Sequence, residues 1–400
     1  MFELLTRLKE DPILGLMARY RDDPAAQKVD LGVGVYRDVA GRTPVLDCVR
    51  RAERAVLAAQ DTKSYVGPAG RAAFNDAVTG LVLSARHPAV LDRRVRTIQA
   101  PGGCGALRVG AELVRAATPG ATVWVSDPTW ANHLPLLGNS GLRIERYPYY
   151  DPAAHELRFD AMLRHLAHAK PGDVVLIHAC CHNPTGADLD HGQWLGLTGE
   201  LARRGLVPFL DLAYQGFAED FSADAAELRL MIEGLPESLS AISFSKNLGL
   251  YRERVGALIV VAGSESRAEA AQSHVVQIAR SIYSMPPDHG AAIAAHIFAD
   301  PELTDSWLAE LALMRDRIRG MRKLLAAQLR EAGRDDSFDH LASQRGMFSL
   351  LGISGEAVMR LRERHHIYMT ADSRINLAGV MPENVAYLAE SVIAATRAPA

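Results

Sequence analysis

The chain has 400 residues, of which 48% are hydrophobic and 23% are charged, and its formal net charge is −3. This length is enough for one large and one smaller domain with a sizeable buried core. The near-neutral charge balance, without long runs of one sign, argues against nucleic acid or an anionic membrane as partner and favours small metabolites.

The N-terminal arm, residues 1–43, begins with "MFELLTRLKEDP", which mixes charges into its apolar pattern and so excludes the hydrophobic region of a signal peptide. We expect this arm to pack on the second lobe of the protein. The longest apolar run, "VGALIVVAG", is too short to span a membrane. Four cysteines are too few for a disulfide framework, and we therefore expect a cytoplasmic protein.

Residues 44–304 are predicted to form a large domain around a mostly parallel, seven-stranded sheet with helices on both faces. Strand-like runs alternate here with segments of helical period, such as residues 105–117 and 193–205. The strands are expected at residues 95–100, 121–128, 142–150, 173–181, 205–214, 239–245 and 255–263.

Residues 305–400 are predicted to form a connecting helix and a small α/β lobe. An apolar stripe continues over many turns from residue 305 to 332, which indicates one long helix leading out of the sheet domain. Strand-like pieces at residues 346–352, 366–370 and 374–380 then alternate with amphipathic segments at 356–365 and 383–395.

Polar residues follow several of the predicted strands. In open α/β sheets, ligands bind outside the carboxyl ends of the strands, so these residues are expected to meet at one rim. They include Asp127, Trp130, Asn183, Asp211, Tyr214 and Lys246.

Lys246 follows an apolar run that is predicted as a buried strand. An amine near a core can lose its proton and become a nucleophile that forms Schiff bases. For Lys246 alone, a strand-end lysine that extends to water is the simpler interpretation. Asp211 also ends an apolar strand, where it is either a turn or cap residue or the partner of a cation such as a protonated pyridine nitrogen.

The stretch "PGGCGALRVG" begins a predicted helix with a glycine-rich loop, whose free N–H groups suit a phosphate. Its spacing is not the G-x-G-x-x-G of dinucleotide folds. Hydroxyl groups and a guanidinium from the stretch "SFSKNLGLYRERVG" are candidates for the same phosphate. These candidates are Ser243, Ser245 and Arg254.

Two further positions have both a structural and a functional interpretation. Trp130 is either a core tryptophan or a flat platform for an aromatic ring. Asn183 in "NPTG" is either a turn former or an amide donor to a phenolic oxygen.

Histidines beside the cysteine pair invite comparison with a metal site. His178 and His182 flank Cys180 and Cys181, but two histidines on one strand are expected to lie far apart, and no second ligand pair follows at zinc spacing. We therefore predict no metal. His133 is interpreted as a core histidine or as a neighbour of site residues.

Together these residues resemble the class I pyridoxal-phosphate-dependent aminotransferases, in the subgroup of aspartate and aromatic amino acid aminotransferases. The resemblance covers nearly the whole chain, and its ordered motifs are highly specific. They include "LGVGVYRD", "PGGCGALR", "SDPTWANH", "CCHNPTGADL", "DLAYQGF", "SFSKNLGLYRERVG", "YSMPPDHGA", "GMFSLLG" and "DSRINLAG". The resemblance implies a fold-type I homodimer with pyridoxal 5'-phosphate as cofactor and with amino acids and 2-oxo acids as substrates.

The resemblance also implies roles for single residues. The implied catalytic residues are Lys246, which holds the cofactor and moves the proton, Asp211, which pairs with the pyridine nitrogen, and Tyr65. The implied cofactor-binding residues are Asn183 and Tyr214 at the phenolic oxygen, Trp130 on the ring, and Gly102, Gly103, Cys104, Ser243, Ser245 and Arg254 at the phosphate, with Tyr65 of the partner subunit. The implied substrate-binding residues are Gly34, Trp130, Asn183, Arg374 for the α-carboxylate, and Arg280 of the partner subunit for a side-chain carboxylate.

Some positions depart from the family pattern. Cys104 stands where a threonine or serine hydroxyl is usual, so we expect weaker retention of the cofactor. Met285 and Ser64 differ from aspartate-specific members, and an apolar methionine suits an aromatic substrate. Val35 and Thr43, in contrast, resemble the aspartate enzymes. We therefore expect amino transfer from tyrosine and phenylalanine, and from aspartate, to 2-oxoglutarate.

Three alternative functions follow from the same residues. A strict aspartate aminotransferase is the alternative within the family. A lyase or decarboxylase on the same scaffold usually alters the groups that bind the substrate, and the presence of Arg280 and Arg374 argues against it. A ligand-binding domain without activity is disfavoured because the candidate chemical residues are present, apart from a hydroxyl at position 104.

Overall fold

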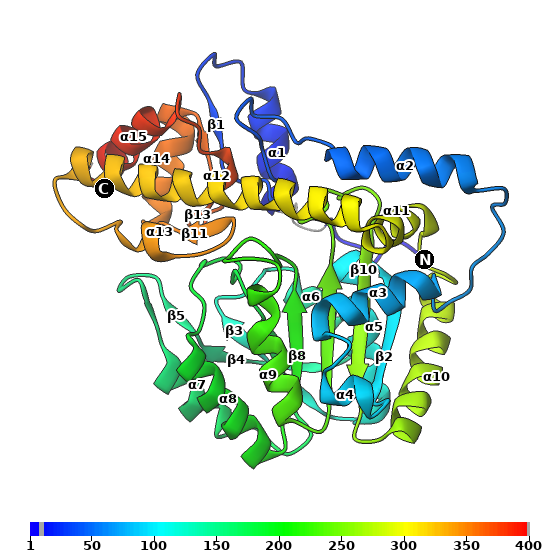
Figure 1. Cartoon of the computed structure of the whole chain (residues 1–400). Helices are drawn as coiled ribbons and strands as arrows, with labels where there is room; N and C mark the ends of the chain where they lie inside the picture. Colours follow the sequence, from blue (N-terminus) through cyan, green and yellow to red (C-terminus); the bar gives the residue numbers. More distant parts are fainter. Residues whose placement is uncertain (8–11, 398–400) are drawn as a thin grey trace.

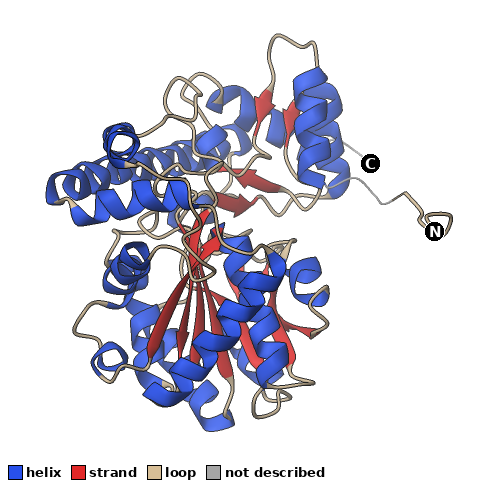
Figure 2. Ribbon diagram, turned by 90° about the vertical axis from the view of Figure 1, so that its right-hand side faces the viewer, coloured by secondary structure: helices blue, strands red, loops and turns tan. Residues whose placement is uncertain are grey.

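The structure is a computed structural model that describes residues 1–7 and 12–397. Residues 8–11 of the expected N-terminal arm and residues 398–400 of the expected small lobe lie outside the described residues. A seven-stranded sheet forms the centre of the larger lobe, and a second lobe lies beyond the carboxyl ends of its parallel strands (Figure 1, Figure 2).

The elements alternate along the chain as an α/β protein requires. The strands are β1 (Val29–Asp30), β2 (Val95–Pro101), β3 (Thr122–Asp127), β4 (Arg143–Pro148), β5 (Tyr150–Asp151), β6 (Glu156–Leu157), β7 (Val174–His178), β8 (Val207–Leu212), β9 (Ser238–Ser243), β10 (Val255–Val261), β11 (Phe348–Leu350), β12 (Ile367–Tyr368) and β13 (Arg374–Asn376). The α-helices are α1 (Pro12–Asp22), α2 (Asp47–Ala59), α3 (Ala72–Leu83), α4 (Pro88–Leu91), α5 (Gly102–Ala117), α6 (His133–Gly138), α7 (Phe159–Leu166), α8 (His191–Arg204), α9 (Ala226–Gly234), α10 (Glu265–Ile282), α11 (Asp288–Ala299), α12 (Pro301–Gly333), α13 (His340–Ser343), α14 (Gly355–His365) and α15 (Val385–Arg397).

The large sheet has the strand order β2-β10-β9-β8-β7-β3-β4. Strand β10 runs antiparallel to both of its neighbours, and the other neighbouring pairs are parallel. The predicted mostly parallel, seven-stranded sheet is thus confirmed. One boundary was wrong: residues 142–150, expected as one strand, divide into β4 and the short β5, because after Tyr149 the chain turns away and pairs β5 with β6 as a hairpin.

Both faces of the sheet are covered by helices, which explains the nearly continuous apolar sequences of its central strands. Strands β7 and β10 are buried along their whole lengths. Helices α5 and α10 each contribute one face to a first hydrophobic cluster. Helices α8, α9 and α11 belong to a second cluster, which continues into the smaller lobe. The core therefore holds the strand ends in fixed positions.

The long helix α12 passes across the molecule between the sheet and the second lobe (Figure 1). It begins at Pro301, earlier than the predicted residue 305, because Asp300 caps it: the Asp300 carboxylate accepts hydrogen bonds from the N–H groups of Glu302 at 2.9 Å and Leu303 at 3.2 Å. The apolar stripe alone does not reveal this capped first turn.

The second lobe contains two small sheets and helices α13, α14 and α15. Strand β11 pairs with β13 in antiparallel fashion, and β1 pairs with β12 in parallel fashion. Through the β1–β12 pairing, residues 29 and 30 of the N-terminal segment join a strand of this lobe. None of the helices in the described part of the chain combines the length and the apolar composition that crossing a membrane requires.

Candidate active site

The predicted site residues surround a cavity at the carboxyl ends of β7, β8 and β9. Its volume is about 130 Å³. It is lined by Gly34, Gly103, Cys104, Leu107, Trp130, His178, Asn183, Asp211, Ala213, Tyr214, Ser243, Ser245, Lys246, Tyr251 and Arg254. The rim that the strand ends were expected to form is therefore present, with most of the expected residues facing one space.

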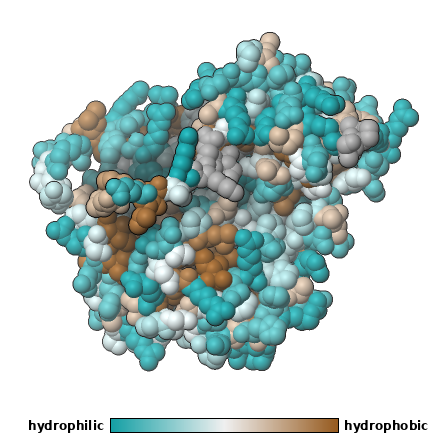
Figure 3. Space-filling view, turned by 180° about the vertical axis from the view of Figure 1, so that it is seen from behind, coloured by the Kyte–Doolittle hydropathy of each residue, from teal (hydrophilic) through white to brown (hydrophobic). Residues whose placement is uncertain are grey.

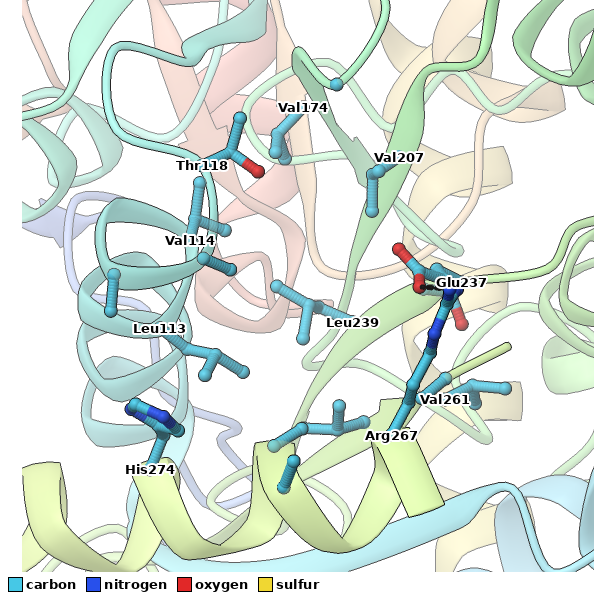
Figure 4. A pocket seen from close by; sticks show the side chains of 18 residues that line it. Leu113, Val114, Thr118, Val174, Val207, Glu237, Leu239, Val261, Arg267 and His274 are labelled. Atoms are coloured by element: carbon cyan, nitrogen blue, oxygen red, sulfur yellow. Dashed lines mark ion pairs between the residues drawn. The ribbon is translucent and has the colours of Figure 1, made fainter. Parts of the chain in front are cut away.

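A larger cavity of about 330 Å³ lies at the opposite end of the sheet, between α5, α10 and the first residues of β7, β8 and β9 (Figure 4). Its lining is mostly aliphatic, and Arg267 is paired there with Glu237 at 3.9 Å. None of the predicted site residues is among its described lining residues. We place the chemistry at the smaller cavity because the nucleophile and the anion-binding groups converge there.

Lys246 follows β9 and projects into the site cavity. Its Nζ lies 5.2 Å from the centroid of the Tyr214 ring. Burial lowers the pKa of the Lys246 ammonium, and the charge of Arg254 lowers it further, against the opposite effect of Asp211. The amine is therefore easier to deprotonate than a lysine in water, as a nucleophile requires.

Asp211 lies in β8 with a buried carboxylate. Burial raises its pKa, but the hydrogen bond from His133 and the nearby charges outweigh burial, and the net effect lowers the pKa. His133 Nε2 lies 3.1 Å from the carboxylate, and its Nδ1 lies 2.8 Å from Thr129 Oγ1. The site thus keeps a negative charge at the end of β8, where it can pair with a cation.

Sequence reasoning left open whether His133 contacts the site residues. It is fully buried at the first position of α6, and Trp130 packs edge-on against it with ring centroids 5.2 Å apart. The sequence feature that could have indicated a contact with the site is the position of His133 in "DPTWANH", directly after the end of a strand. The structure assigns it a definite contact, with Asp211.

The expectation that His178 and His182 lie far apart was wrong. Their ring centroids are 4.4 Å apart. Strand β7 ends at His178, and Cys181 adopts a positive φ of 52°, so the chain turns back instead of continuing as a strand. Burial lowers the pKa of His178 to about 3 and that of His182 well below its usual value. Both rings are therefore neutral at physiological pH.

Two groups of possible metal ligands occur among the described residues. One consists of His133, His178 and Asp211, and the other of Cys180, Cys181 and Asp224. In the first group His133 and Asp211 are hydrogen-bonded to each other. In the second, the Asp224 carboxylate already accepts hydrogen bonds from three backbone N–H groups. Both groups thus take part in the internal hydrogen bonding of the protein.

The N-terminus of α5 forms a concave, positively polarised surface. Gly102 has a φ of +68°, and a Cβ atom there would lie 2.6 Å from Arg254 Nη2; at Gly103 it would lie 3.1 Å from Ser243 Cβ. Arg254 donates to Ser245 Oγ at 3.4 Å, and the Ser243 and Ser245 hydroxyls are 3.2 Å apart. Free N–H groups, two hydroxyls and one guanidinium meet there, as phosphate binding requires.

Cys104 lies in the first turn of α5 and lines the same cavity. Asn132 Nδ2 lies 3.9 Å from its sulfur, which corresponds to a weak hydrogen bond. Burial raises the pKa of the thiol, so Cys104 carries no charge at neutral pH. It contributes a poor donor where the surrounding groups are strong ones.

Arg374 in β13 is buried above the cavity. Its Nη1 donates to Asn183 Oδ1 at 3.3 Å and its Nη2 to the carbonyl of Gly32 at 2.9 Å, while its Nε has no partner. The guanidinium lies over the Phe348 ring, 4.4 Å from its centroid, and a Cβ atom at Gly34 would come within 3.1 Å of the same ring. The open donor suits a carboxylate ligand.

Four predicted site residues are not among those that line the cavity. Gly102 precedes the lining residue Gly103 and Arg374 donates to the lining residue Asn183, whereas Tyr65 and Arg280 lie away from it. Tyr65 is in the segment after α2 and is 86% exposed. Arg280 is an exposed residue in the last turn of α10 that donates to Ser284 Oγ. The single chain does not bring either residue to Lys246.

An amine, a buried carboxylate and a glycine-rich helix N-terminus at the carboxyl edge of such a sheet are typical of an α/β enzyme of amine chemistry. The chain belongs to the aminotransferase class I and II family, whose sequence model matches residues 26–392. It is 44% identical to an aromatic-amino-acid aminotransferase of Pseudomonas aeruginosa, over 98% of both chains, and 43% identical to an aspartate aminotransferase of Escherichia coli, over 98% of this chain and all of the other.

Solved structures agree with this family. An aromatic-amino-acid aminotransferase from Burkholderia pseudomallei, covalently bound to pyridoxal phosphate, superimposes with a TM-score of 0.97 at 42% identity, covering 99% of this chain and 100% of the other. A cytoplasmic aspartate aminotransferase from Saccharomyces cerevisiae has a TM-score of 0.96 at 34% identity, covering 99% of this chain and 98% of the other. The fold is thus that of pyridoxal-phosphate-dependent aminotransferases.

Proposed function

We propose that the protein is a pyridoxal-phosphate-dependent aminotransferase that moves the amino group of tyrosine, phenylalanine and aspartate to 2-oxoglutarate. The observation that carries the proposal is the shared cavity of Lys246 and Asp211, closed at one end by the N-terminus of α5. Relatives named for both aromatic amino acids and aspartate support the mixed substrate range over the strict aspartate alternative.

The residues present fit the cofactor. The hollow that side chains at positions 102 and 103 would fill suits its phosphate, and the ionised Asp211 suits a protonated pyridine nitrogen. When bound, pyridoxal phosphate supplies an aldehyde that condenses with amines and a pyridinium ring that accepts the electron pair released at the substrate Cα. We assign the phosphate to Gly102, Gly103, Cys104, Ser243, Ser245 and Arg254, and the ring to Trp130, Asn183, Asp211 and Tyr214.

Each of the protein's own side chains then has a separate role in the reaction. Lys246 binds the cofactor and takes the proton from Cα, for which its lowered pKa prepares the amine. Asp211, supported by His133, keeps the ring nitrogen protonated. Arg374 binds the α-carboxylate and, with Gly34 and Asn183 beside it, orients the Cα–H bond toward Lys246.

We infer that the protein is a homodimer in which Tyr65 of the partner subunit joins the phosphate site and Arg280 of the partner subunit selects the side-chain carboxylate. Exposed apolar residues near these positions support the inference: Leu57 is 70% and Ile282 46% exposed. On the face in Figure 3, hydrophobic residues gather in patches within a mostly hydrophilic surface. Sedimentation at micromolar concentration tests the dimer, and a monomer excludes these two roles.

We also infer a cytoplasmic location and the domain limits 1–43, 44–304 and 305–400. Four cysteines without disulfides support a reducing compartment. The start of α12 at Pro301, close to residue 305, supports the second domain limit.

Borohydride reduction and kinetics test the function. Reduction of the purified protein is expected to fix a pyridoxyl group on Lys246, and a protein without this adduct contradicts the proposal. Initial rates with phenylalanine and with aspartate, each with 2-oxoglutarate, are expected to be of comparable magnitude. A negligible rate with phenylalanine leaves the strict aspartate aminotransferase.

A further inference from the structure

Arg322, in the middle of α12, is a buried cation outside the cavity. Its side chain is 1% exposed, and it donates to oxygen atoms of one short segment, residues 341–349. The hydrogen bonds run from Nε to Gly346 O (3.0 Å), from Nη1 to Leu341 O (3.2 Å) and Ser349 Oγ (2.6 Å), and from Nη2 to Arg345 O (3.0 Å), Gly346 O (2.8 Å) and Phe348 O (2.5 Å). The guanidinium thus clamps this segment to the long helix.

The clamp works without an ion pair among the described residues. A buried cation usually pairs with a carboxylate. The carboxylate of Asp188 acts on Arg322 only from beyond ion-pair distance. It accepts hydrogen bonds from the N–H groups of Cys181 and His182 instead, both at 2.8 Å. Burial lowers the pKa of Arg322 to about 10, which leaves it charged at neutral pH. Carbonyl dipoles therefore balance the charge of Arg322, and these carbonyls in turn depend on Arg322 as their hydrogen-bond donor.

The clamped segment carries the platform of the carboxylate-binding arginine. Its last residues enter β11, where Leu350 lies opposite Arg374 of β13. The Phe348 ring supports the Arg374 guanidinium from below and packs edge-on against Tyr214, with centroids 5.9 Å apart. Displacement of β11 therefore moves both the platform and the strand of Arg374.

The same segment also rests on the turn that contains Asn183. The N–H of Arg345 donates to the carbonyl of Gly186 at 2.7 Å. Gly186 has a φ of +69°, and a Cβ atom there would lie 2.4 Å from the carbonyl oxygen of Phe348 and 3.0 Å from Arg322 Nη2. The segments that carry the two supports of Arg374, the Phe348 ring and the Asn183 amide, thus both adjoin Arg322.

We propose that Arg322 is a positioning residue for α-carboxylate recognition: it fixes β11 and the neighbouring turn so that Arg374 faces the substrate. The inference rests on the proposed function and adds a residue that touches neither substrate nor cofactor. It predicts a selective defect. Binding of any ligand with the carboxylate weakens, whereas the phosphate contacts at α5 and the contact of Asp211 in β8 with the ring are unaffected.

The test compares Arg322→Gln, Arg322→Lys and the matched control Arg319→Gln. Arg319 lies one turn earlier on α12 and also donates to a backbone carbonyl, that of Ala218 at 2.7 Å, but outside the clamped segment. For Arg322→Gln we expect KM for phenylalanine and aspartate to rise at least about tenfold while kcat falls less than about threefold. The cofactor Kd is expected to stay within about twofold of wild type. Arg322→Lys should recover part of the loss, and Arg319→Gln should match wild type.

A second measurement separates carboxylate recognition from general loosening. Absorbance of the bound cofactor gives the Kd of 3-phenylpropionate, which carries the carboxylate, and the half-reaction rate with 2-phenylethylamine, which lacks it. Arg322→Gln should weaken the binding of 3-phenylpropionate and leave the rate with 2-phenylethylamine unchanged; equal losses, or none, overturn the proposal.

If Arg322→Gln does not fold, Ser349→Ala, which removes one acceptor, must show the same selectivity in smaller degree. The absence of this selectivity also overturns the proposal. A wild-type protein without any amine half-reaction instead contradicts the proposed function.

Discussion

His133 Nε2 lies 3.1 Å from a carboxylate oxygen of Asp211, and both side chains are buried. The contact joins the first residue of α6 to the carboxyl end of β8, which are far apart in the sequence. It offsets the cost of burying a carboxylate and lowers the pKa of Asp211. The geometry therefore keeps the charge that the proposed cofactor requires at its ring nitrogen.

Replacement of His133 by alanine is expected to slow catalysis. Without its hydrogen bond the pKa of Asp211 rises, protonation of the ring nitrogen becomes less favourable, and kcat falls by about tenfold or more. Single-turnover absorbance with phenylalanine measures the effect. His87→Ala is the control, because His87 is buried but instead caps α4 through the N–H of Ala89. Equal losses in the two variants would falsify a specific role for His133.

Buried neutral histidines are expected to make the apoprotein sensitive to mild acid. The pKa of His178 is about 3 in the folded protein and about 6.5 in the unfolded chain, so below pH 6.5 the unfolded chain binds the additional proton. His178 thus stabilises the fold less as the pH falls from 6.5, by about 1.4 kcal/mol at pH 5.5. Urea unfolding at pH 7.5 and 5.5 measures this loss.

The variant His178→Gln isolates that contribution. Its loss of stability between pH 7.5 and 5.5 should be smaller than that of wild type by about 1.4 kcal/mol, because glutamine does not titrate. His178 Nε2 has no hydrogen-bond partner, so the replacement removes no bond from that atom. An identical pH dependence in both proteins contradicts the assignment.

Gly102→Ala is expected to weaken cofactor binding. The new Cβ would lie 2.6 Å from Arg254 Nη2 at a φ of +68°, so the guanidinium must move away from the phosphate site. We expect the Kd of pyridoxal phosphate, titrated into the apoprotein, to rise about tenfold. In Gly120→Ala the φ is +90°, but no heavy atom lies within 4 Å. This control should lose about 1 kcal/mol of stability and bind the cofactor as wild type does.

Cys104→Thr is expected to strengthen cofactor binding, because a hydroxyl is a better donor to a phosphate than a thiol. The Kd should fall about tenfold. Cys104→Ala separates donation from shape: if the thiol contributes little, this variant binds the cofactor nearly as wild type does. An unchanged Kd in Cys104→Thr would show that position 104 is not a phosphate ligand.

The succession of strands along the chain and the residues at their ends were predictable from the sequence. Apolar runs of strand length, separated by helical segments, predicted the sheet, and the rule for open α/β sheets placed Asp211, Asn183 and Lys246 at one rim. These predictions succeeded because each depends on a few consecutive residues. Element boundaries were predicted less accurately: α12 begins at Pro301, one turn before the predicted residue 305.

Contacts between distant segments were not predictable. The ring contact of His178 and His182 depends on the positive φ of Cys181, and the support of Arg374 by Phe348 depends on how β11 meets the sheet domain. The hydrogen bonds of Arg322 could not be predicted from local periodicity, because in the sequence Arg322 is one of many charged residues in a long helix. Such contacts depend on backbone geometry and packing across the whole chain.

The sequence by itself determined the α/β class, the amine at the end of β9 and the glycine-rich start of α5, because hydrophobic period and strand-end polarity are local properties of a chain. Only the tertiary structure decided that Asp211 is ionised against His133 and that Arg374 is supported by Phe348 and Asn183. Burial and neighbouring charges set a pKa and an orientation, and both arise only when segments remote in sequence pack together.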